Sequence, residues 1–406
     1  MNKLKRFFTA FRSREPKQLS TADKREMRRR RARRRTVWRI VVVLLLVASL
    51  VLVWQNWEYL SPDNWGRYFE EWFGGGTGSY PVNMTGTHVH RLAQAEDYAA
   101  VLTDSHLIYL NRNGAEISRY NCAYPTAVMR TAGEYVLVAE QGGNRLHLST
   151  RSKVVLEKSL DKESKILSAS VNAEGQIAVL TNGPQGYLVQ ITVYDRTGKL
   201  LYTRNRNHTA TDITLSPDGT QVATLSVDAD SGNLNTSMDV FSLQTNDTAA
   251  MCSYVTQDLL LYRAEYLNGG WLAGFSETGV VLMNTATGAT TVYAPADMHV
   301  LGFAVAGNDC AVAVRPYGDT GGGQVHIVNT AGTVTRTLDF TGGFRHLSGY
   351  EQQYVLLTDS YVQYLSATAV GTPVAVKADG QQVILTDGRG VVLGLNRLEA
   401  FDLIAE

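Results

Sequence analysis

Cysteine is scarce in this 406-residue chain: Cys122, Cys252 and Cys310 are the only ones, and they stand far apart. Such a sparse, odd-numbered set excludes a disulfide framework and contains no CxxC pair of the kind that binds zinc. Glycine and tyrosine are plentiful, at 36 and 20 residues, which favours a protein of strands and turns. Apolar residues make up 44% and charged residues 19%, so most of the chain can bury a core.

The local motifs of common enzyme classes are also absent. The sequence has no Gly-x-Ser-x-Gly elbow of serine hydrolases, no Gly-x-x-x-x-Gly-Lys phosphate loop and no strand–GxGxxG–helix unit. The glycine-rich stretch 318–323 precedes a strand, so we interpret it as a loop. His88 and His90 would share one face of a strand, but no third metal ligand stands nearby in the sequence. We therefore expect no catalytic residue, no cofactor and no bound metal.

A net charge of zero conceals two oppositely charged parts. Residues 1–39 hold 16 of the 38 basic and 3 of the 38 acidic side chains, so the remainder of the chain is acidic. Residues 28–35 are all arginine except Ala32. Such a run can bind nucleic acid, or it can fix membrane topology and attract anionic lipid. No aromatic residue interleaves the run to stack on bases, so we favour the membrane and expect no nucleic-acid partner.

An apolar segment, Val37–Trp54, follows this run with Arg39 as its only charge. Its 18 residues would span about 27 Å as a helix, close to the roughly 30 Å of a hydrocarbon core. The alternative, a cleavable signal peptide, is disfavoured because Trp54–Trp57 is a poor cleavage site. Since the arginines mark the inner side, the N-terminus is expected in the cytoplasm and the rest outside the cell membrane.

A second helix is expected next. Ser61 and Pro62 suit its first positions, and the glycines 74–76 end it. Its apolar stripe either lies on the outer membrane surface or packs on the following domain. The residues expected at the membrane interface are Arg39, Trp54, Trp57, Trp65, Phe69, Trp72 and Phe73.

From Tyr80 onward the chain consists of short alternating strands. One strand ending in a small or polar residue recurs eight times, from Val101–Asp104 to Ile384–Asp387, at a mean spacing of about 40 residues. That spacing is the period of a four-stranded propeller blade. Hairpin turns, in which glycine follows three or four residues after Asn or Asp, are expected at Asn111, Asp195, Asn284 and Asn329.

We therefore predict an all-β β-propeller of about eight four-stranded blades, with seven as the alternative. The last repeat lacks an obvious fourth strand, which Tyr80–Met84 could supply by joining the beginning of the domain to its end. The predicted blades cover residues 84–120, 124–160, 165–204, 208–248, 257–294, 299–340, 343–371 and 372–403.

The whole chain is thus expected to contain four parts. These are a basic cytoplasmic tail (1–36), a transmembrane helix (37–57), a juxtamembrane amphipathic helix with a glycine linker (58–79) and an extracytoplasmic propeller (80–406).

The arginine run, the segment Leu60–Asn64 and the strand-rich stretch Tyr80–Leu243 together resemble a family of uncharacterised bacterial membrane-anchored propellers, the domain of unknown function number 5711. The matching motifs within that stretch are 149–153, 193–195 and 215–219. The resemblance implies the architecture, the anchor and a Gram-positive-type host, and it assigns no activity or catalytic residue.

Three repeats carry long connections between their second and third strands, at 182–187, 228–236 and 315–323. In a propeller these connections share a face with the blade-to-blade crossings, and insertions on one face often mark a binding surface. Long surface loops also arise at little cost in free energy, which is the alternative. The candidate binding-face residues are Gln185, Tyr187, Asp228, Asp230, Asn233, Asn235, Arg315, Tyr317 and Asp319.

We accordingly predict a non-enzymatic binding or scaffold module on the outer side of the cell membrane. Its partners would be membrane lipid and a protein or cell-wall ligand. The alternative is a propeller enzyme or ligand sensor with a site in the central channel. Each blade would contribute one residue to such a site, and sequence spacing cannot reveal it.

Overall fold

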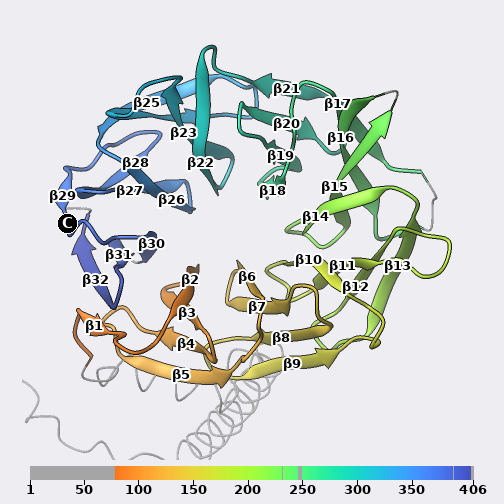
Figure 1. Cartoon of the computed structure of the whole chain (residues 1–406), viewed down its shortest axis with the longest axis horizontal. Coiled ribbons are helices and arrows are strands. Elements are labelled where there is room, and N and C mark those ends of the chain that lie inside the picture. The colour runs from red at the N-terminus through yellow and green to blue at the C-terminus, as the bar shows by residue number, and fades with distance from the viewer. Residues whose placement is uncertain (1–77, 231, 246–248, 387, 404–406) are drawn as a thin grey trace, which may run out of the picture. The chain divides into compact units, whose positions relative to one another are not determined.

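The computed structural model describes residues 78–403 except 231, 246–248 and 387. Its 32 strands form eight antiparallel four-stranded sheets arranged in a ring (Figure 1). This confirms the all-β propeller and the count of eight blades. In this part of the chain there is no helix long and apolar enough to span a bilayer. The predicted tail, transmembrane helix and amphipathic helix, with every predicted membrane-interface residue, lie outside the described residues.

The strands of the first four blades run in chain order from the centre of the ring to its rim (Figure 1). They are β2 (Val89–Ala95), β3 (Tyr98–Thr103), β4 (His106–Leu110) and β5 (Glu116–Asn121); β6 (Ala127–Ala132), β7 (Tyr135–Glu140), β8 (Arg145–Ser149) and β9 (Val154–Ser159); β10 (Ile166–Val171), β11 (Ile177–Asn182), β12 (Val189–Tyr194) and β13 (Leu200–Arg206); and β14 (Thr209–Leu215), β15 (Gln221–Asp230), β16 (Asn233–Ser242) and β17 (Cys252–Thr256).

Blades five to seven follow the same order, and blade eight takes its outer strand from the beginning of the domain. These strands are β18 (Arg263–Leu267), β19 (Trp271–Phe275), β20 (Val280–Asn284) and β21 (Thr290–Tyr293); β22 (Met298–Ala306), β23 (Asp309–Pro316), β24 (Gly322–Val328) and β25 (Val334–Thr341); β26 (Phe344–Tyr350), β27 (Gln353–Thr358), β28 (Tyr361–Ser366) and β29 (Val374–Ala375); and β30 (Gln382–Thr386), β31 (Arg389–Leu393), β32 (Arg397–Asp402) and β1 (Val82–Asn83).

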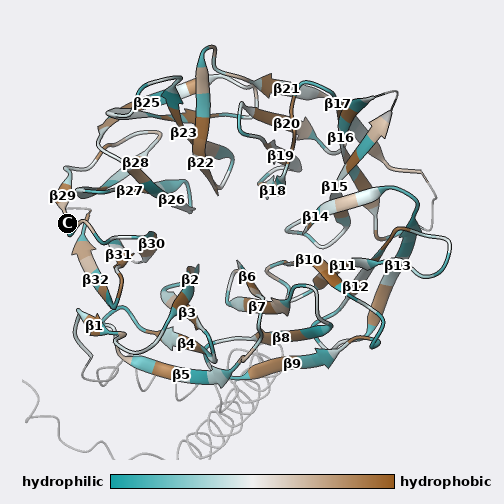
Figure 2. Ribbon diagram, viewed as in Figure 1, coloured by the Kyte–Doolittle hydropathy of each residue, from teal (hydrophilic) through white to brown (hydrophobic). Residues whose placement is uncertain are grey.

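The second strand of each blade is the repeat seen in the sequence. β3, β7 and β11 are near-continuous apolar runs because they are buried on both faces, between the two neighbouring blades. Outer strands such as β5 and β9 instead alternate between exposed and half-buried positions. One apolar cluster fills each of the eight interfaces between blades, and Figure 2 shows hydrophobic residues in every blade.

The predicted hairpin turns are present between the third and fourth strands. At the first, the side-chain oxygen of Asn111 accepts hydrogen bonds from the backbone N–H groups of Asn113 and Ala115, each at 2.9 Å. Gly114 completes the turn with a φ of 80°, which a side chain would disfavour. The turn thus depends on the Asn-x-x-Gly pattern itself.

The ring closes as predicted, through a strand from the beginning of the domain. Val82 pairs with Leu398 and Asn83 with Arg397, so β1 becomes the fourth strand of the last blade. Next to this pairing, the backbone N–H of Met84 donates to the carbonyl of Asn396 at 2.8 Å. The two ends of the propeller are therefore joined within one sheet.

Two predicted blade limits are wrong. The outer strand of the fourth blade, β17, lies beyond the predicted end at residue 248, and that of the seventh, β29, lies beyond residue 371. β17 follows a long connection, and β29 pairs through two residues only, Val374 and Ala375. Neither strand is long or regular enough to stand out from the sequence pattern.

A buried ion pair joins the third and fourth blades. Nη2 of Arg206 lies 2.8 Å from Oδ2 of Asp239, with the two side chains 12% and 8% exposed. Nη1 of Arg206 donates to the Thr224 hydroxyl at 2.9 Å, and the Ser253 hydroxyl donates to Asp239 Oδ1 at 2.6 Å. The Arg206 guanidinium also lies over the ring of Phe241, 4.9 Å from its centroid. Each charge is thus compensated within the network.

Removing one partner should be costly. In Asp239→Ala the Arg206 guanidinium would stay buried without its counter-charge, so the free energy of unfolding should fall by about 3–5 kcal/mol. Denaturation of the full-length chain by urea, followed by circular dichroism, measures this. The control is Asp402→Ala, which removes the exposed pair of Asp402 with Arg389 and should cost less than about 1 kcal/mol. Equal losses in the two variants would contradict the assignment.

Candidate functional site in the central channel and on the loop face

Five of the eight innermost strands begin with a β-bulge at the same place. In β2 the pairing with β3 shifts between Val89 and Arg91, which leaves His90 as the extra residue. The strands β10, β14, β22 and β26 show the same shift. A bulge increases the local twist and re-aims the side chains beside it. The residues that directly follow a bulge and line the channel are Arg91, Ser168, Asp212 and His346.

The innermost strands enclose a channel of about 830 Å³, lined by residues of all eight blades. In Figure 1 the strands β2, β6, β10, β14, β18, β22, β26 and β30 surround this central space. The volume lies within the range of small-molecule binding sites, about 300–1,000 Å³. The channel is therefore large enough for a ligand.

Two carboxylates of the channel lining, Asp212 and Glu265, form ion pairs with an arginine. Nη2 of Arg263 lies 2.8 Å from Oε1 of Glu265, and its Nε lies 3.9 Å from Oδ2 of Asp212. Asp212 is buried and also accepts hydrogen bonds from the Ser168 hydroxyl at 2.8 Å and the Ala264 backbone N–H at 3.1 Å. Burial lowers the pKa of Arg263, but the two carboxylates outweigh it and the net shift is upward. The two carboxylates outnumber the one guanidinium, so this side of the channel carries one net negative charge.

Two other arginines face the same space without such partners. Among the described residues, no carboxylate lies within 4.0 Å of Arg91 on β2 or Arg130 on β6, and the only hydrogen bond from the Arg130 guanidinium goes to the carbonyl of Met129, at 3.3 Å. Burial, and secondly the charge of Arg263, lower the pKa of Arg130 to about 10, against the opposing effect of Asp212 and Glu265. Burial and Arg263 also lower the pKa of Arg91. Both guanidinium groups remain charged at neutral pH.

Neutral His346 stands near Arg91. Its Nδ1 lies 3.1 Å from the carbonyl oxygen of Val383 in the neighbouring blade. Burial, and secondly the charge of Arg91, lower the pKa of His346 from 6.5 to about 4. The imidazole therefore joins two blades without adding positive charge to the channel at neutral pH.

This shift predicts a pH dependence of stability. The unfolded chain protonates this histidine below about pH 6.5, whereas the folded protein resists protonation until about pH 4. Its contribution is therefore complete above pH 6.5 and is lost as the pH falls towards 4, by about 3 kcal/mol. His346→Gln should lose this part of the pH dependence in urea titrations at pH 7.0, 5.5 and 4.5. If the free energy of unfolding of His346→Gln depends on pH as it does in the unsubstituted protein, the assignment is contradicted.

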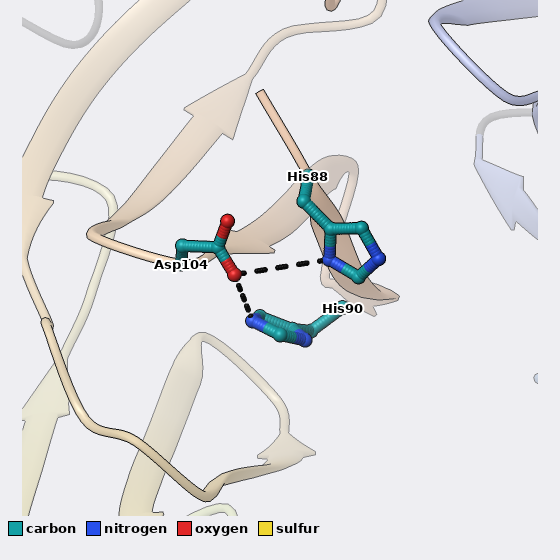
Figure 3. A group of neighbouring side chains, drawn as sticks. All are labelled: His88, His90 and Asp104. Carbon is teal, nitrogen blue, oxygen red and sulfur yellow. Dashed lines mark ion pairs between the residues drawn. The ribbon is translucent and has the colours of Figure 1, made fainter. Parts of the chain in front are cut away.

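His88 and His90 have a third neighbour that the sequence analysis missed. Asp104 follows β3, and the pairing of β2 with β3 brings it beside both histidines (Figure 3). Its Oδ1 lies 2.6 Å from Nε2 of His90 and 3.8 Å from Nδ1 of His88, and all three side chains are exposed. The hairpin register could have revealed this group, because Val89 pairs with Thr103, the residue before Asp104.

The geometry of this group suits an ion pair better than a metal. Two ligands of a tetrahedral zinc ion stand about 3.3 Å apart, since each bond is about 2.0–2.1 Å long. The separation of 2.6 Å between His90 and Asp104 is that of a charge-assisted hydrogen bond. Binding a metal here would require breaking that contact.

We predict that the purified protein carries less than 0.1 equivalent of zinc, nickel or copper at this group. Elemental analysis after dialysis measures this, and the thermal midpoint should not change on addition of EDTA. One equivalent of metal that is lost in Asp104→Asn would contradict the prediction and assign the group as a metal site.

The predicted loop residues of the third blade are exposed. Gln185 and Tyr187 lie in the connection 183–188 between β11 and β12. A backbone hydrogen bond from Tyr187 N–H to the Pro184 carbonyl, at 2.9 Å, forms a tight turn. The tyrosine side chain is therefore presented to solvent from a defined backbone.

The predicted loop 228–236 in the fourth blade is instead an extended hairpin. β15 and β16 continue pairing to the tip, with Asp228 opposite Asn235 and Asp230 opposite Asn233. The turn needs one residue at positive φ, which Gly232 supplies at 87°. Polar composition suggested a loop, but strands that project into solvent can be polar on both faces. Asp228 and Asn233 are exposed, and Asn235 is half-buried.

The sixth blade presents Tyr317 and Asp319 in the connection 317–321. Both are exposed, and the Tyr317 ring stacks on His299 at a centroid distance of 5.5 Å. Arg315 has a different role from these two residues. Its guanidinium donates to the carbonyls of Gly322 and Gly342, so it holds the loop in place.

The connections between second and third strands lie on one face together with the blade-to-blade crossings, and we call this the loop face. Backbone hydrogen bonds link the two kinds of segment, for example from Gly142 to Ile166 at 2.7 Å and from Asn182 to Lys165 at 3.1 Å. The predicted segments share this face, but they belong to blades three, four and six rather than to one compact site.

Comparison with solved structures supports the fold. BamB from Moraxella catarrhalis has 13% identity and a TM-score of 0.51, covering 80% of this chain and 99% of its own. AztD from Citrobacter koseri has 11% identity and a TM-score of 0.49, covering 79% and 95%. The WD40 domain of Pan2 from Neurospora crassa has 8% identity and a TM-score of 0.47, covering 79% and 90%. At these identities the likeness to BamB shows a shared propeller fold alone.

No curated protein matches the sequence. A family model does match the sequence, and the match covers most of the propeller. Residues 81–370 match the Family of unknown function (DUF5711), and this chain therefore belongs to that family.

Proposed function

We propose that this chain is a membrane-anchored, extracytoplasmic binding module that docks a protein partner on its loop face. The observation that carries this proposal is a set of large apolar side chains left exposed there. Tyr187 is 46% and Tyr317 is 60% exposed, and Leu188, Leu234 and Leu395 on the same face are also exposed. Tyrosine is enriched at protein–protein interfaces because its ring buries a large apolar area while its hydroxyl stays hydrogen-bonded.

The location outside the membrane rests on the sequence. The arginine run 28–35 before the apolar segment 37–54 supports a single span with the propeller on the outer side. The acidic balance of the remaining chain suits a protein partner with a basic surface. Anionic lipid would interact with the basic tail.

A non-enzymatic role is supported by the state of the channel carboxylates. Asp212 and Glu265 both hold Arg263, and Asp212 also accepts two hydrogen bonds. A carboxylate tied in this way is a poor general base, because a base must be free to take a proton from its substrate. Binding is the activity that these groups support best.

The docking face can be tested by photo-cross-linking in cells. A photoreactive amino acid at position 187 or 317 of the full-length protein should capture one envelope protein. The matched control is position 200, where Leu200 is 55% exposed but follows the turn between β12 and β13 on the opposite face. The yield of the captured product at position 187 should fall at least tenfold in Tyr317→Ala, and the yield at position 317 should fall equally in Tyr187→Ala.

An identical set of products from all three positions would show that capture depends on exposure alone. That outcome, or the absence of any product at positions 187 and 317, would overturn the docking proposal.

A further inference from the structure

The channel separates its charges across the ring. Arg263 is compensated by Glu265 and Asp212 on blades four and five, whereas Arg91 and Arg130 stand on the neighbouring blades one and two. The remaining carboxylate of the lining, Glu96, belongs to the turn after β2, five residues beyond Arg91. Five strand residues span about 16 Å, so Glu96 lies towards the other mouth of the channel. Asp212 and Glu265 act on Arg130, and Glu265 on Arg91, only from a distance, so neither arginine has a carboxylate of the described residues in direct contact.

Two guanidinium groups without direct counter-charges lower the free energy of unfolding unless a ligand compensates them. Each group is partly desolvated, and the charges of Arg91 and Arg263 both lower the pKa of Arg130. The cost falls mainly on half-buried Arg130, because a buried cation is normally paired directly with a carboxylate. Arg91 still reaches channel water, because more than a third of its surface is exposed. A ligand in the channel could therefore contact it directly.

The chemistry of the two arginines indicates which class of ligand would bind. A guanidinium presents planar forked N–H donors that match the oxygens of phosphate or carboxylate. Two such groups on the innermost strands of neighbouring blades suit a dianion, and a phosphate monoester carries about −1.5 to −2 charge with three acceptor oxygens. The opposite wall is aromatic: Phe303 stacks on Phe275 at 3.7 Å, and Tyr262 lies 6.2 Å from Phe303. This wall would contact the organic part of a ligand.

We propose that Arg91 and Arg130 bind the phosphate group of a small phosphate monoester in the central channel, with its organic part against Tyr262 and Phe303. The volume of about 830 Å³ accommodates a ligand larger than the phosphate itself. This site lies inside the ring, and neither this proposal nor the docking proposal depends on the other.

Isothermal titration of the full-length protein in detergent tests the site, with phenyl phosphate and inorganic phosphate as separate probes. Phenyl phosphate should bind with one-to-one stoichiometry, at least tenfold tighter than inorganic phosphate, and the affinity should fall as salt is raised. Arg91→Gln and Arg130→Gln should each weaken binding at least tenfold, and the double variant should abolish it. Arg91→Lys should retain intermediate affinity, because lysine keeps the positive charge but lacks the paired N–H donors of the guanidinium group.

The control is Arg119→Gln, which removes the same charge from β5 on the outside of the first blade and should leave binding unchanged. Thermal melting without ligand separates a binding role from a structural one. Because the two channel arginines repel each other, the glutamine variants should melt at or above the temperature of the unsubstituted protein.

Three outcomes would overturn the proposal. The first is no binding of phenyl phosphate at millimolar concentration, and the second is binding that both glutamine substitutions leave intact. The third is a thermal midpoint in Arg91→Gln and Arg130→Gln that falls as far as in Asp239→Ala, which would make the arginines structural. Equal affinity for the two probes would overturn the part of the proposal that places the organic group against Tyr262 and Phe303.

Discussion

Closure of the ring is the constraint on which this structure depends. Each blade buries its faces against two neighbours, so an open ring would expose the apolar faces of the first and last blades to water. The two-residue strand β1 prevents this by completing the eighth blade, and Val82 and Met84 pack into the cluster shared with Leu92 and Leu398. At the centre, the side-chain oxygen of Gln382 accepts a hydrogen bond from the Leu92 N–H at 2.9 Å. Contacts at the rim and at the centre of the ring thus stabilise the interface between blades eight and one.

Closure also creates the channel, and several polar groups within it form hydrogen bonds between blades. Ser168 and Ala264 both donate to Asp212, which joins three successive blades, while His346 lies against the backbone of Val383 in the next blade. These groups hold the inner strands together. Arg91 and Arg130 take no part in this network, so the structural requirements of the ring leave them unexplained and a ligand accounts for them more directly.

Much of the fold could be predicted from the sequence, but little of the site could. The second strands, such as β3, are buried on both faces and carry a strong apolar repeat, and the Asn111–Gly114 turn type fixes its own geometry. β17 and β29 have weak patterns, and the hairpin of β15 and β16 is polar because it projects into solvent. The channel arginines come from separate repeats about 40 residues apart, so no local motif marks them. The proximity of His88 and Asp104 could have been predicted, because one hairpin places them side by side.

The two proposed sites meet at one residue. Tyr262 lines the channel, is 47% exposed and precedes β18 at the crossing between blades four and five, which belongs to the loop face. Coupling between two sites requires that each ligand change the free energy of the other's binding. In a closed ring of packed blades, a rearrangement of whole blades would break several apolar interfaces at once. A channel ligand and a docked protein would therefore influence each other through direct contact at Tyr262, and any coupling should be confined to partners that reach that side chain.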